Sequence, residues 1–379
     1  MWRAPSILVA VVLVLLALGI VMLASTSGVV EKGGLSDPLF FLKRQLVWLA
    51  IAAVAGVVSA VFIDYHWWRK LAVPLAVVAA LGLMLVFVPH IGCKVNGASR
   101  WVQIGPVRGQ PSELAKFATV VMLASWMAYA GHRASRLKEG FMIPLAALGL
   151  MLALIMAEPD FGTTFLVGMT GLAIMFAGGT KIPYLLGAGT LGISGFMLAI
   201  THNPNRWHRF SAFLHPSEYP TEAYQLRQSI DAFIMGGGLG VGLGESLQKH
   251  AYLPEAHTDF ILAIIGEELG LAATLLVVIL FVAFFICGLV ISMNASDIFG
   301  RLLGFGITML ITTQAAINIG VVTGCLPTKG LPLPFISAGG SNLVIVLFSA
   351  GVLINIARHS DGRVVDEHTR VIKDSVHWA

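Results

Sequence analysis

Long apolar blocks of roughly 17–25 residues recur along almost the whole chain and limit what it can fold into. At about 1.5 Å per residue, a helix of that length crosses a hydrocarbon core of about 30 Å. Hydrophobic residues fill 57% of the 379 positions and charged residues only 12%, too few charges to solvate a globule. The strands of an outer-membrane barrel would instead alternate apolar and polar residues. The sequence therefore predicts an all-α polytopic membrane protein.

The apolar blocks define about ten candidate transmembrane helices. They cover about 6–27, 45–63, 71–89, 113–131, 141–157, 163–179, 183–201, 259–292, 301–322 and 341–357. The eighth is longer than a bilayer requires, so we expect it to tilt or to project beyond the membrane. The first is longer than the apolar region of a signal peptide, which favours an uncleaved helix.

Three hydrophilic loops, at 90–112, 202–258 and 323–340, fall on one side of this arrangement. Lys and Arg are equally numerous on the two sides, but setting aside the two long loops and their edges leaves twelve on the other side against four, which places both termini in the cytoplasm and the large loops outside the cell membrane. Residues 1–358 then form a single transmembrane domain. The polar tail at 359–379 is expected to be cytoplasmic and disordered.

Neither the charge nor the cysteines point to another class of protein. The net charge of +4 is spread along the chain, which argues against nucleic acid and favours anionic membrane lipid as a partner. Cys93, Cys287 and Cys325 follow no metal-binding or redox spacing. A Cys93–Cys325 bridge between the outer loops stays an open alternative.

Charged residues stand at the start of the fourth span, in Q-P-S-E-L-A-K at 110–116. Ser112 is a candidate N-cap, with Glu113 in the first turn and Lys116 one turn later. A capped helix with a surface ion pair is sufficient to explain these residues.

The loop at 202–258 is the richest in polar residues. It opens with Arg206 and Arg209 on either side of an aromatic residue, and the apolar pattern of 224–235 predicts a helix. The glycine-rich segment 236–246 lacks a nucleotide-binding spacing, so we expect a hinge or close helix packing there. The loop ends at the eighth span, where Thr258 or Asp259 could serve as the N-cap.

Two glutamates, Glu267 and Glu268, lie inside the eighth span. An ionisable residue within a span is costly, so we expect either a cation partner such as Lys329 or Arg206, or a wet end of the helix. Lys329 itself stands in a Pro- and Gly-rich stretch, whose irregular backbone is tolerated at membrane depth only if it is buried or lines a cavity. Both features predict a polar interior near the outer face.

Two sets of side chains are candidates for a metal ion. Glu158 and Asp160 share a tight turn, although Asp160 could instead cap the sixth helix through Thr163. The second set is His250, Glu255, His257 and Asp259, whose geometry the sequence does not fix. No metal ligand is assigned and no cofactor is certain; a divalent cation, Mg²⁺ or Mn²⁺, stays an open alternative.

Seven motifs, in order, resemble those of the SEDS proteins of bacterial shape, elongation, division and sporulation, which polymerise lipid II into peptidoglycan. They are N-G-A-S-R-W at 96–101, Q-P-S-E-L-A-K at 110–116, P-D-F-G-T at 159–163, Arg206 with Arg209, Y-Q-x-x-Q-S from Tyr224, L-P-E-A-H-T-D-F from Leu253, and P-x-K-G-x-P-L-P-F-x-S-x-G-G-S from Pro327. The resemblance spans about 6–358 and favours the FtsW division branch over the RodA elongation branch. The chain departs from the usual pattern at Ala338 and Asn342, where the family mostly reads S-Y-G-G-S-S. It also departs at Glu158, where glutamine is common in the family.

The resemblance implies a peptidoglycan glycosyltransferase in the bacterial cytoplasmic membrane, at the division septum if the FtsW branch holds. It implies that Asp259 is the catalytic acid–base residue. The substrate-binding positions that it implies are Lys329, Arg206, Arg209, Glu113, Lys116, Arg100, Lys249 and Ser337. The implied partners are lipid II, which is an undecaprenyl-pyrophosphate-linked disaccharide peptide, a class B penicillin-binding protein transpeptidase, and other divisome or elongasome proteins.

The chemistry agrees with this placement of residues. Glycosyl transfer from a lipid diphosphate needs a base for the acceptor hydroxyl and cations for the departing diphosphate. Asp259 would activate the 4-hydroxyl of the acceptor GlcNAc for an inverting attack on the donor MurNAc. A lipid II flippase is the main alternative, but transporters usually show internal repeats and none is found. A scaffold for the transpeptidase is a third hypothesis.

Overall fold

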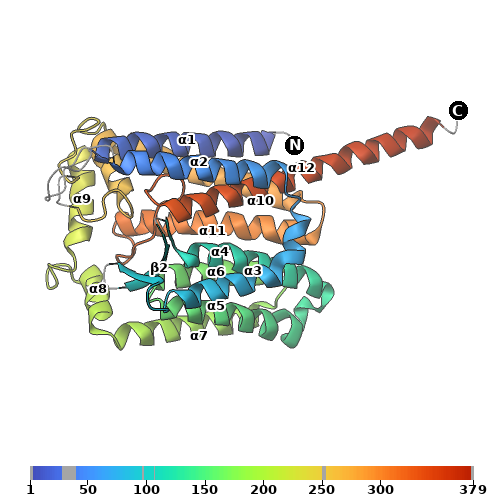
Figure 1. Cartoon of the computed structure of the whole chain (residues 1–379), viewed down its shortest axis with the longest axis horizontal. Coiled ribbons are helices and arrows are strands. Elements are labelled where there is room, and N and C mark those ends of the chain that lie inside the picture. The colour runs from blue at the N-terminus through green and yellow to red at the C-terminus, as the bar shows by residue number, and fades with distance from the viewer. Residues whose placement is uncertain (1–2, 28–39, 96–97, 106, 250–252, 377–379) are drawn as a thin grey trace.

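The computed structural model describes residues 3–27, 40–95, 98–105, 107–249 and 253–376. Long helices run side by side in a bundle. The first helix begins, and the last helix leaves the bundle, at the same end (Figure 1). The helices are α1 (Arg3–Ser27), α2 (Phe40–Val61), α3 (His66–Leu85), α4 (Pro111–Ala130), α5 (Ile143–Ala157), α6 (Phe161–Ala177), α7 (Ile182–Thr201), α8 (Pro204–Leu214), α9 (Tyr224–Gly236), α10 (Ile261–Met293), α11 (Ile298–Val322) and α12 (Gly340–Val376). A 3₁₀ helix at Gly131–Ser135 and a π-helical turn at Leu137–Met142 join α4 to α5.

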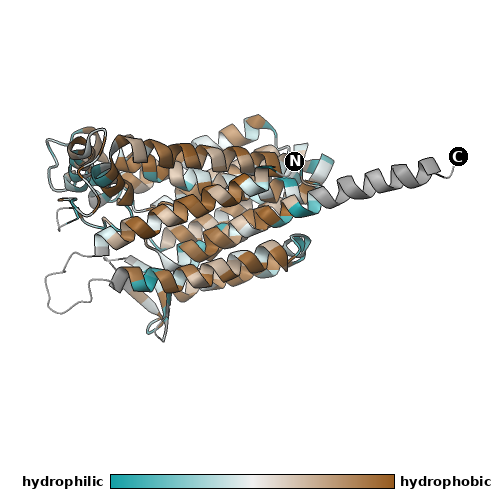
Figure 2. Ribbon diagram, turned by 90° about the horizontal axis from the view of Figure 1, so that it is seen from above, coloured by the Kyte–Doolittle hydropathy of each residue, from teal (hydrophilic) through white to brown (hydrophobic). Residues whose placement is uncertain are grey.

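Within the described residues, nine helices are long and apolar enough to cross a membrane. The shorter apolar helix α6, at 17 residues, supplies the tenth predicted span. Hydrophobic residues dominate the sides of the bundle, and hydrophilic residues gather toward its ends (Figure 2). Large apolar side chains such as Val54 and Val73 are more than half exposed, as contact with lipid requires. The prediction of an all-α, multi-pass membrane protein is confirmed.

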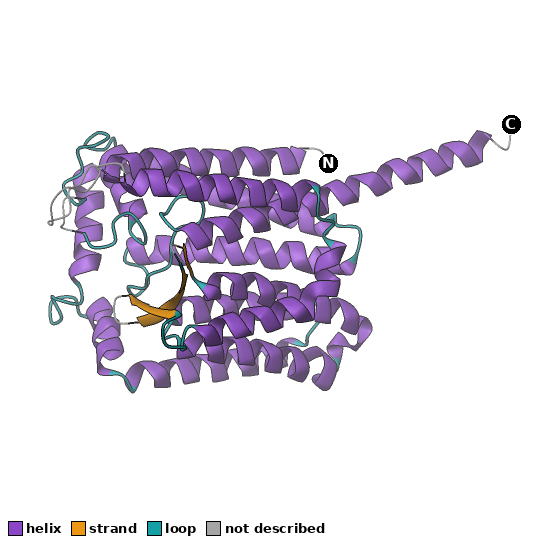
Figure 3. Cartoon of the chain, viewed as in Figure 1, coloured by secondary structure: helices purple, strands orange, loops and turns teal. Residues whose placement is uncertain are grey.

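The three hydrophilic loops meet at the end of the bundle opposite the start of α1 (Figures 1 and 3). We call this the loop end; it carries α8, α9, residues 323–339 and a small antiparallel sheet. The sheet has the order β1 (Gly92–Val95), β2 (Ala98–Ile104), β3 (Val107–Gly109). The sequence analysis missed these strands because three to seven residues give too short a pattern.

A backbone break inside α10 explains why the eighth span is over-long. The helix runs for 33 residues, but Gly270 has a φ of +73°, a conformation that favours glycine. The glycine-rich segment packs against the break, since Val241 N donates to Glu267 O (2.9 Å) and Gly242 N donates to Glu268 O (3.0 Å). The expected close packing of this segment is confirmed.

The structure excludes one open alternative and contradicts one expectation. The cysteines Cys93, Cys287 and Cys325 are all free, so no Cys93–Cys325 bridge forms. The polar tail is helical rather than disordered up to Val376, because α12 continues past the bundle without interruption. Extending an existing helix adds a hydrogen bond per residue with no new nucleation cost.

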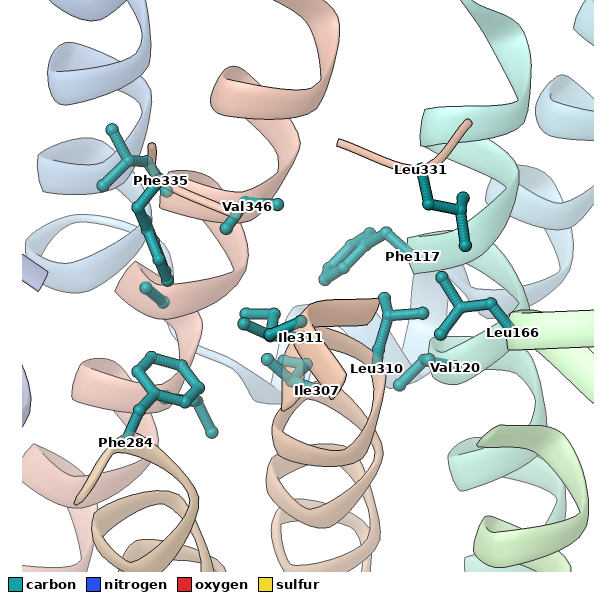
Figure 4. Close-up of a cluster of buried hydrophobic side chains, with 14 of the residues drawn as sticks. Phe117, Val120, Leu166, Phe284, Ile307, Leu310, Ile311, Leu331, Phe335 and Val346 are labelled. Carbon is teal, nitrogen blue, oxygen red and sulfur yellow. The ribbon is translucent and has the colours of Figure 1, made fainter. Parts of the chain in front are cut away.

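Helix α11 forms the centre of the core. Figure 4 shows Ile307, Leu310 and Ile311 of α11 between Phe284 on one side and Leu166 on the other, and all are buried. Because α11 is surrounded by other helices, any polar side chain on it must find a partner inside the protein.

Candidate active site

A cavity of 440 Å³ opens at the loop end. Its walls come from β2, the start of α6, the end of α7, α8 and the loop before α12. The lining residues are Arg100, Pro159, Asp160, Phe161, Gly162, Phe196, Met197, Ile200, Asn203, Arg206, Arg209, Phe210, Pro327, Thr328, Lys329 and Gly330. Four of the predicted substrate-binding residues, Arg100, Arg206, Arg209 and Lys329, are therefore brought together around one cavity.

Aromatic rings, rather than carboxylates, hold two of these cations. The Arg206 guanidinium lies 3.9 Å from the centre of the Phe161 ring, and the Lys329 amino group lies 4.2 Å from that of Phe196. A cation on a ring face is stabilised without losing its charge. Burial lowers the pKa of Lys329 to about 8, although the Asp160 carboxylate acts to raise it. These cations stay available for an anionic ligand.

Arg100 is fixed by the turn between α5 and α6. Its guanidinium donates to the backbone carbonyls of Glu158 (3.3 Å) and Pro159 (2.6 Å). These bonds use two of its donors, and among the described residues no carboxylate forms an ion pair with it. Arg100 thus adds to the positive field of the cavity.

Asp259 lies at the edge of the cavity. Its carboxylate packs against the lining residue Gly330 so closely that a Cβ added there would overlap Oδ2. Burial raises the pKa of Asp259 to about 7, with further increases from the Glu255 and Asp160 carboxylates and an opposing effect of Arg100. A carboxylate with a pKa near neutrality can both accept and return a proton.

The structural alternative for this position is wrong. Helix α10 begins at Ile261 with Phe260 as its N-cap, and no side chain forms a capping hydrogen bond. Neither Thr258 nor Asp259 therefore serves as the cap. The carboxylate of Asp259 is left for a different role.

Asp160 and Glu158 behave differently from one another. Asp160 caps α6, accepting from the Thr163 backbone N–H (3.1 Å) and hydroxyl (2.9 Å), as the sequence alternative predicted. Glu158 is fully buried, and within the part of the chain that the structure describes neither of its carboxylate oxygens has a hydrogen-bond partner. Burial, with the nearby Asp160 carboxylate, raises the pKa of Glu158 to about 8, and Arg100 opposes this. Glu158 is therefore mostly neutral at pH 7.

The described residues contain no group of three or more His, Cys, Asp and Glu side chains placed to hold a metal ion. Of the second candidate set, His250 lies outside the described residues.

Glu113 and Lys116 lie outside the cavity lining, contrary to the position expected for them. They form a buried ion pair (2.8 Å) rather than a surface one, and Lys116 is only 1% exposed. Lys116 also donates to Gln314 Oε1 (2.8 Å), and Asn342 donates to Glu113 (2.9 Å). Ser112 does not cap α4, since its hydroxyl has no partner and Gln110 is the N-cap residue. The pair joins three helices inside the core.

Lys249 is also absent from the cavity lining. Its amino group pairs with Glu268 (2.9 Å) and donates to Ser25 Oγ (3.2 Å). The expected cation partner is present for Glu268, but it is Lys249, which follows the glycine-rich segment, rather than Lys329 or Arg206. Glu267 instead accepts hydrogen bonds from Ser246 and from the Leu247 backbone.

Ser337 holds the loop before α12 against the segment that carries Asp259. Its hydroxyl donates to Thr258 O (2.5 Å) and accepts from Leu333 N (2.8 Å). Ala338 N donates to His257 O (3.0 Å) in the same seam. Ser337 is buried, and its contacts are to backbone rather than to the cavity.

Comparison with known proteins identifies the family to which the chain belongs. Residues 5–362 match the FtsW, RodA and SpoVE family, which is described as "Cell cycle protein". The chain belongs to this family. The predicted resemblance is thus confirmed over nearly the whole chain.

Named relatives of this family member favour its FtsW branch. "Probable peptidoglycan glycosyltransferase FtsW" of Trichlorobacter lovleyi is 41% identical over 352 residues, which cover 93% of this chain and 92% of the relative. Its namesake in Geobacter metallireducens is 40% identical over 361 residues, covering 95% and 96%. "Stage V sporulation protein E" of Bacillus subtilis is 38% identical over 359 residues, covering 93% and 97%.

Solved structures of the family have the same fold. A chain of a peptidoglycan synthase complex, in which polymerization and crosslinking are coordinated, matches with a TM-score of 0.77 at 25% identity, covering 93% of this chain and 97% of that chain. The rod shape determining protein RodA of Thermus thermophilus matches with a TM-score of 0.69 at 25% identity, covering 93% and 95%.

The sequence analysis did not single out Gln314 and Asn318 of α11. Both are about 1% exposed and bind the backbone near the cavity. Their signal was present, since two polar residues four positions apart lie on one face of an otherwise apolar span.

Proposed function

We propose that this chain is a peptidoglycan glycosyltransferase of the FtsW branch, which polymerises lipid II at the outer face of the cytoplasmic membrane during cell division. The observation that carries the proposal is the cavity itself. Arg100, Arg206, Arg209 and Lys329 surround it, and Asp259 stands at its edge. The names of the FtsW relatives support the same activity.

The reaction assigns a part to each group. Asp259 takes the proton from the acceptor sugar 4-hydroxyl, whose oxygen forms a new bond to the anomeric carbon of the donor. The bond from that carbon to the diphosphate oxygen breaks, and its electron pair leaves on undecaprenyl diphosphate. Lys329, Arg206, Arg209 and Arg100 stabilise this anion, which is the developing charge that a preorganised site must meet. Attack opposite the leaving group inverts the anomeric centre.

The partner of this chain is a class B penicillin-binding protein transpeptidase, which would crosslink the strands as they are made. The likeness to a chain of a peptidoglycan synthase complex supports this part of the proposal. The large apolar surface of the helices provides room for a membrane-embedded partner. The division septum is the corresponding location in the cell.

The test is polymerisation of labelled lipid II by the purified chain, with and without its transpeptidase partner. We expect glycan strands from the parent and none from Asp259→Asn, with equal thermal stability. Asp231→Asn is the matched control, because Asp231 on α9 does not line the cavity. A fully active Asp259→Asn would contradict the assignment of the base.

A flippase would give a different result. If neither parent nor variant makes strands with the partner present, while the parent moves lipid II across vesicle membranes, the polymerase proposal is wrong. Four of the predicted cations gather at one end of the bundle, which is the arrangement that a polymerase needs and not a path across the membrane.

A further inference from the structure

The loop between α11 and α12 is partly buried, although its backbone forms neither helix nor strand hydrogen bonds. Residues 325–339 form neither helix nor strand, yet Leu331, Leu333 and Phe335 are buried. Buried carbonyl groups outside regular structure need hydrogen-bond donors from elsewhere. Because this loop carries Lys329 and Gly330, its donors decide where the cation stands relative to Asp259.

A single side chain donates to both halves of the site. The Asn318 amide Nδ2 lies 2.7 Å from the Asp259 carbonyl oxygen and 2.7 Å from that of Leu331. An amide nitrogen has two protons, so each carbonyl receives one. Asn318 is 1% exposed, which shields both bonds from competing water.

Two further contacts fix the loop side of this arrangement. Gln314, one helical turn before Asn318, donates to Pro332 O (2.8 Å) and accepts from Lys116 (2.8 Å). The Leu331 side chain points into the core near Leu166 (Figure 4), and Gly162 leaves space for it, since a Cβ there would lie 3.1 Å from Leu331 Cγ. The loop is thus held at consecutive residues by α11 and α6.

We propose that Asn318 is a positioning residue for glycosyl transfer, whose one amide joins the backbone of Asp259 to the backbone of the Lys329 loop. The distance between the base and the cation is then set by α11 and not by either of the two segments alone. This inference rests on the proposed function, because it takes Asp259 as the base. A misplacement of about 1 Å between reacting groups can cost about a hundredfold in rate.

The geometry explains why asparagine is required. Among the described residues the Asn318 carbonyl oxygen Oδ1 has no hydrogen-bond partner, so only the two protons of the amide are used. Serine could supply one donor, and leucine or aspartate at neutral pH none. Leucine is of similar size, so it removes both bonds with little change in packing volume.

The two hydrogen bonds from the Asn318 amide, to Asp259 O and to Leu331 O, are called the clamp below, and they also affect the Asp259 carboxylate. That carboxylate is faced by Gly330 of the loop, by the carboxylates of Glu255 and Asp160, and by Arg100. Without the clamp, Gly330 would no longer be held against it and water could solvate the charge. The pKa of Asp259, now raised by burial to about 7, would then fall toward its ordinary value.

The experiment compares Asn318→Leu with Asn355→Leu. Asn355 of α12 is equally buried and also bonds to backbone, donating to Ala60 O (3.1 Å) and accepting from Tyr65 N (2.9 Å), but it lies away from the cavity lining. Purified full-length variants, with the transpeptidase partner, polymerise labelled lipid II over a range of pH. We expect Asn318→Leu to lower kcat about tenfold or more with a smaller change in KM. We also expect the acid limb of the pH–rate profile to move to lower pH, because the pKa of Asp259 falls.

The control should lose stability without moving that limb. Equal losses of rate in both variants with unchanged acid limbs would show a merely structural amide and overturn the proposal. If Asn318→Leu fails to fold, Asn318→Ser is measured in its place. Asn318→Ser keeps one donor, so its kcat should lie between those of the parent and of a variant without donors. A kcat equal to that of the parent overturns the proposal. Asp259→Asn is measured in parallel to distinguish failure of the proposed function from failure of this inference. If Asp259→Asn is active, Asp259 is not the base and both proposals are wrong. If Asp259→Asn is inactive while Asn318→Leu has the rate of the parent, only the role of Asn318 is refuted.

Discussion

Gly330 lies against the carboxylate of Asp259 with no room for a single additional carbon atom. The two residues are 71 positions apart in the sequence, and they meet because the loop before α12 folds back across the start of α10. Gly330 is thus part of the wall that shields Asp259 from water. It also neighbours Lys329, so any shift at this position moves the cation and the carboxylate together.

This contact predicts the effect of one methyl group. Gly330→Ala should lower the rate of lipid II polymerisation about tenfold or more, because Asp259 or the loop must move to admit the Cβ. Gly238→Ala is the matched control, since a Cβ there would meet nothing within 4 Å. The comparison is made on initial rates of equally folded variants. Equal rates in Gly330→Ala and the parent would contradict the close approach.

The two shifted groups of the site predict a bell-shaped pH–rate profile at low lipid II concentration. Asp259 must be ionised to act as the base, so activity is lost as the pH falls through about 7. Lys329 must keep its proton, so activity is lost as the pH rises through about 8. Low substrate concentration is needed because kcat/KM reports the free enzyme.

The alkaline limb has its own control. In Lys329→Arg the guanidinium keeps its charge throughout this range, so the limb near pH 8 should disappear even if the rate falls. The limb near pH 7 should stay. An alkaline limb unchanged in Lys329→Arg would assign it to another group.

Much of the fold could be predicted because lipid imposes a simple rule. A span must satisfy its own backbone and be about 20 residues long, so apolar blocks locate helices directly. The site was predictable only through motifs, which named Asp259, Lys329 and the arginines without their geometry. What brings them together is tertiary: the seam of Ser337 with Thr258, and the amide of Asn318 between two distant segments. No periodic pattern encodes such contacts.

The errors have the same origin. A cation partner was one of two expectations for Glu268, with Lys329 and Arg206 as examples, but the partner is Lys249, which the glycine-rich segment brings to α10 at the break at Gly270. A backbone break of this kind needs only one glycine. The sequence has 41 glycines, and nothing local distinguishes this one.

The buried Glu158 predicts a pH-dependent stability. Its folded pKa is raised from 4.5 to about 8, so its contribution is fully favourable below pH 4.5 and is lost as the pH rises to about 8. Glu158→Gln removes this loss. The melting temperature of the variant in detergent should therefore exceed that of the parent by an amount that grows between these pH values and is constant above them. Glu218→Gln, at an exposed site, should follow the parent at every pH.

The buried pair Glu113–Lys116 predicts a contrast between single and double variants. Lys116→Met leaves the Glu113 carboxylate buried with only the Asn342 amide, and should cost about 3–5 kcal/mol of stability. Adding Glu113→Gln removes the stranded charge and keeps an acceptor for Asn342, so much of the loss should be recovered. Thermal unfolding in detergent measures both effects.

The same double variant decides between two roles for the pair. The resemblance implies that Glu113 and Lys116 bind substrate, but both lie outside the cavity lining and join α4 to α11 and α12 through Gln314 and Asn342. If the pair only supports the fold, the recovered double variant should polymerise lipid II at a rate within a few-fold of the parent, because the cations of the cavity are untouched. A double variant that is as stable as the parent yet inactive would instead require these side chains to meet the substrate, and the cavity would then have to extend into the bundle when lipid II binds.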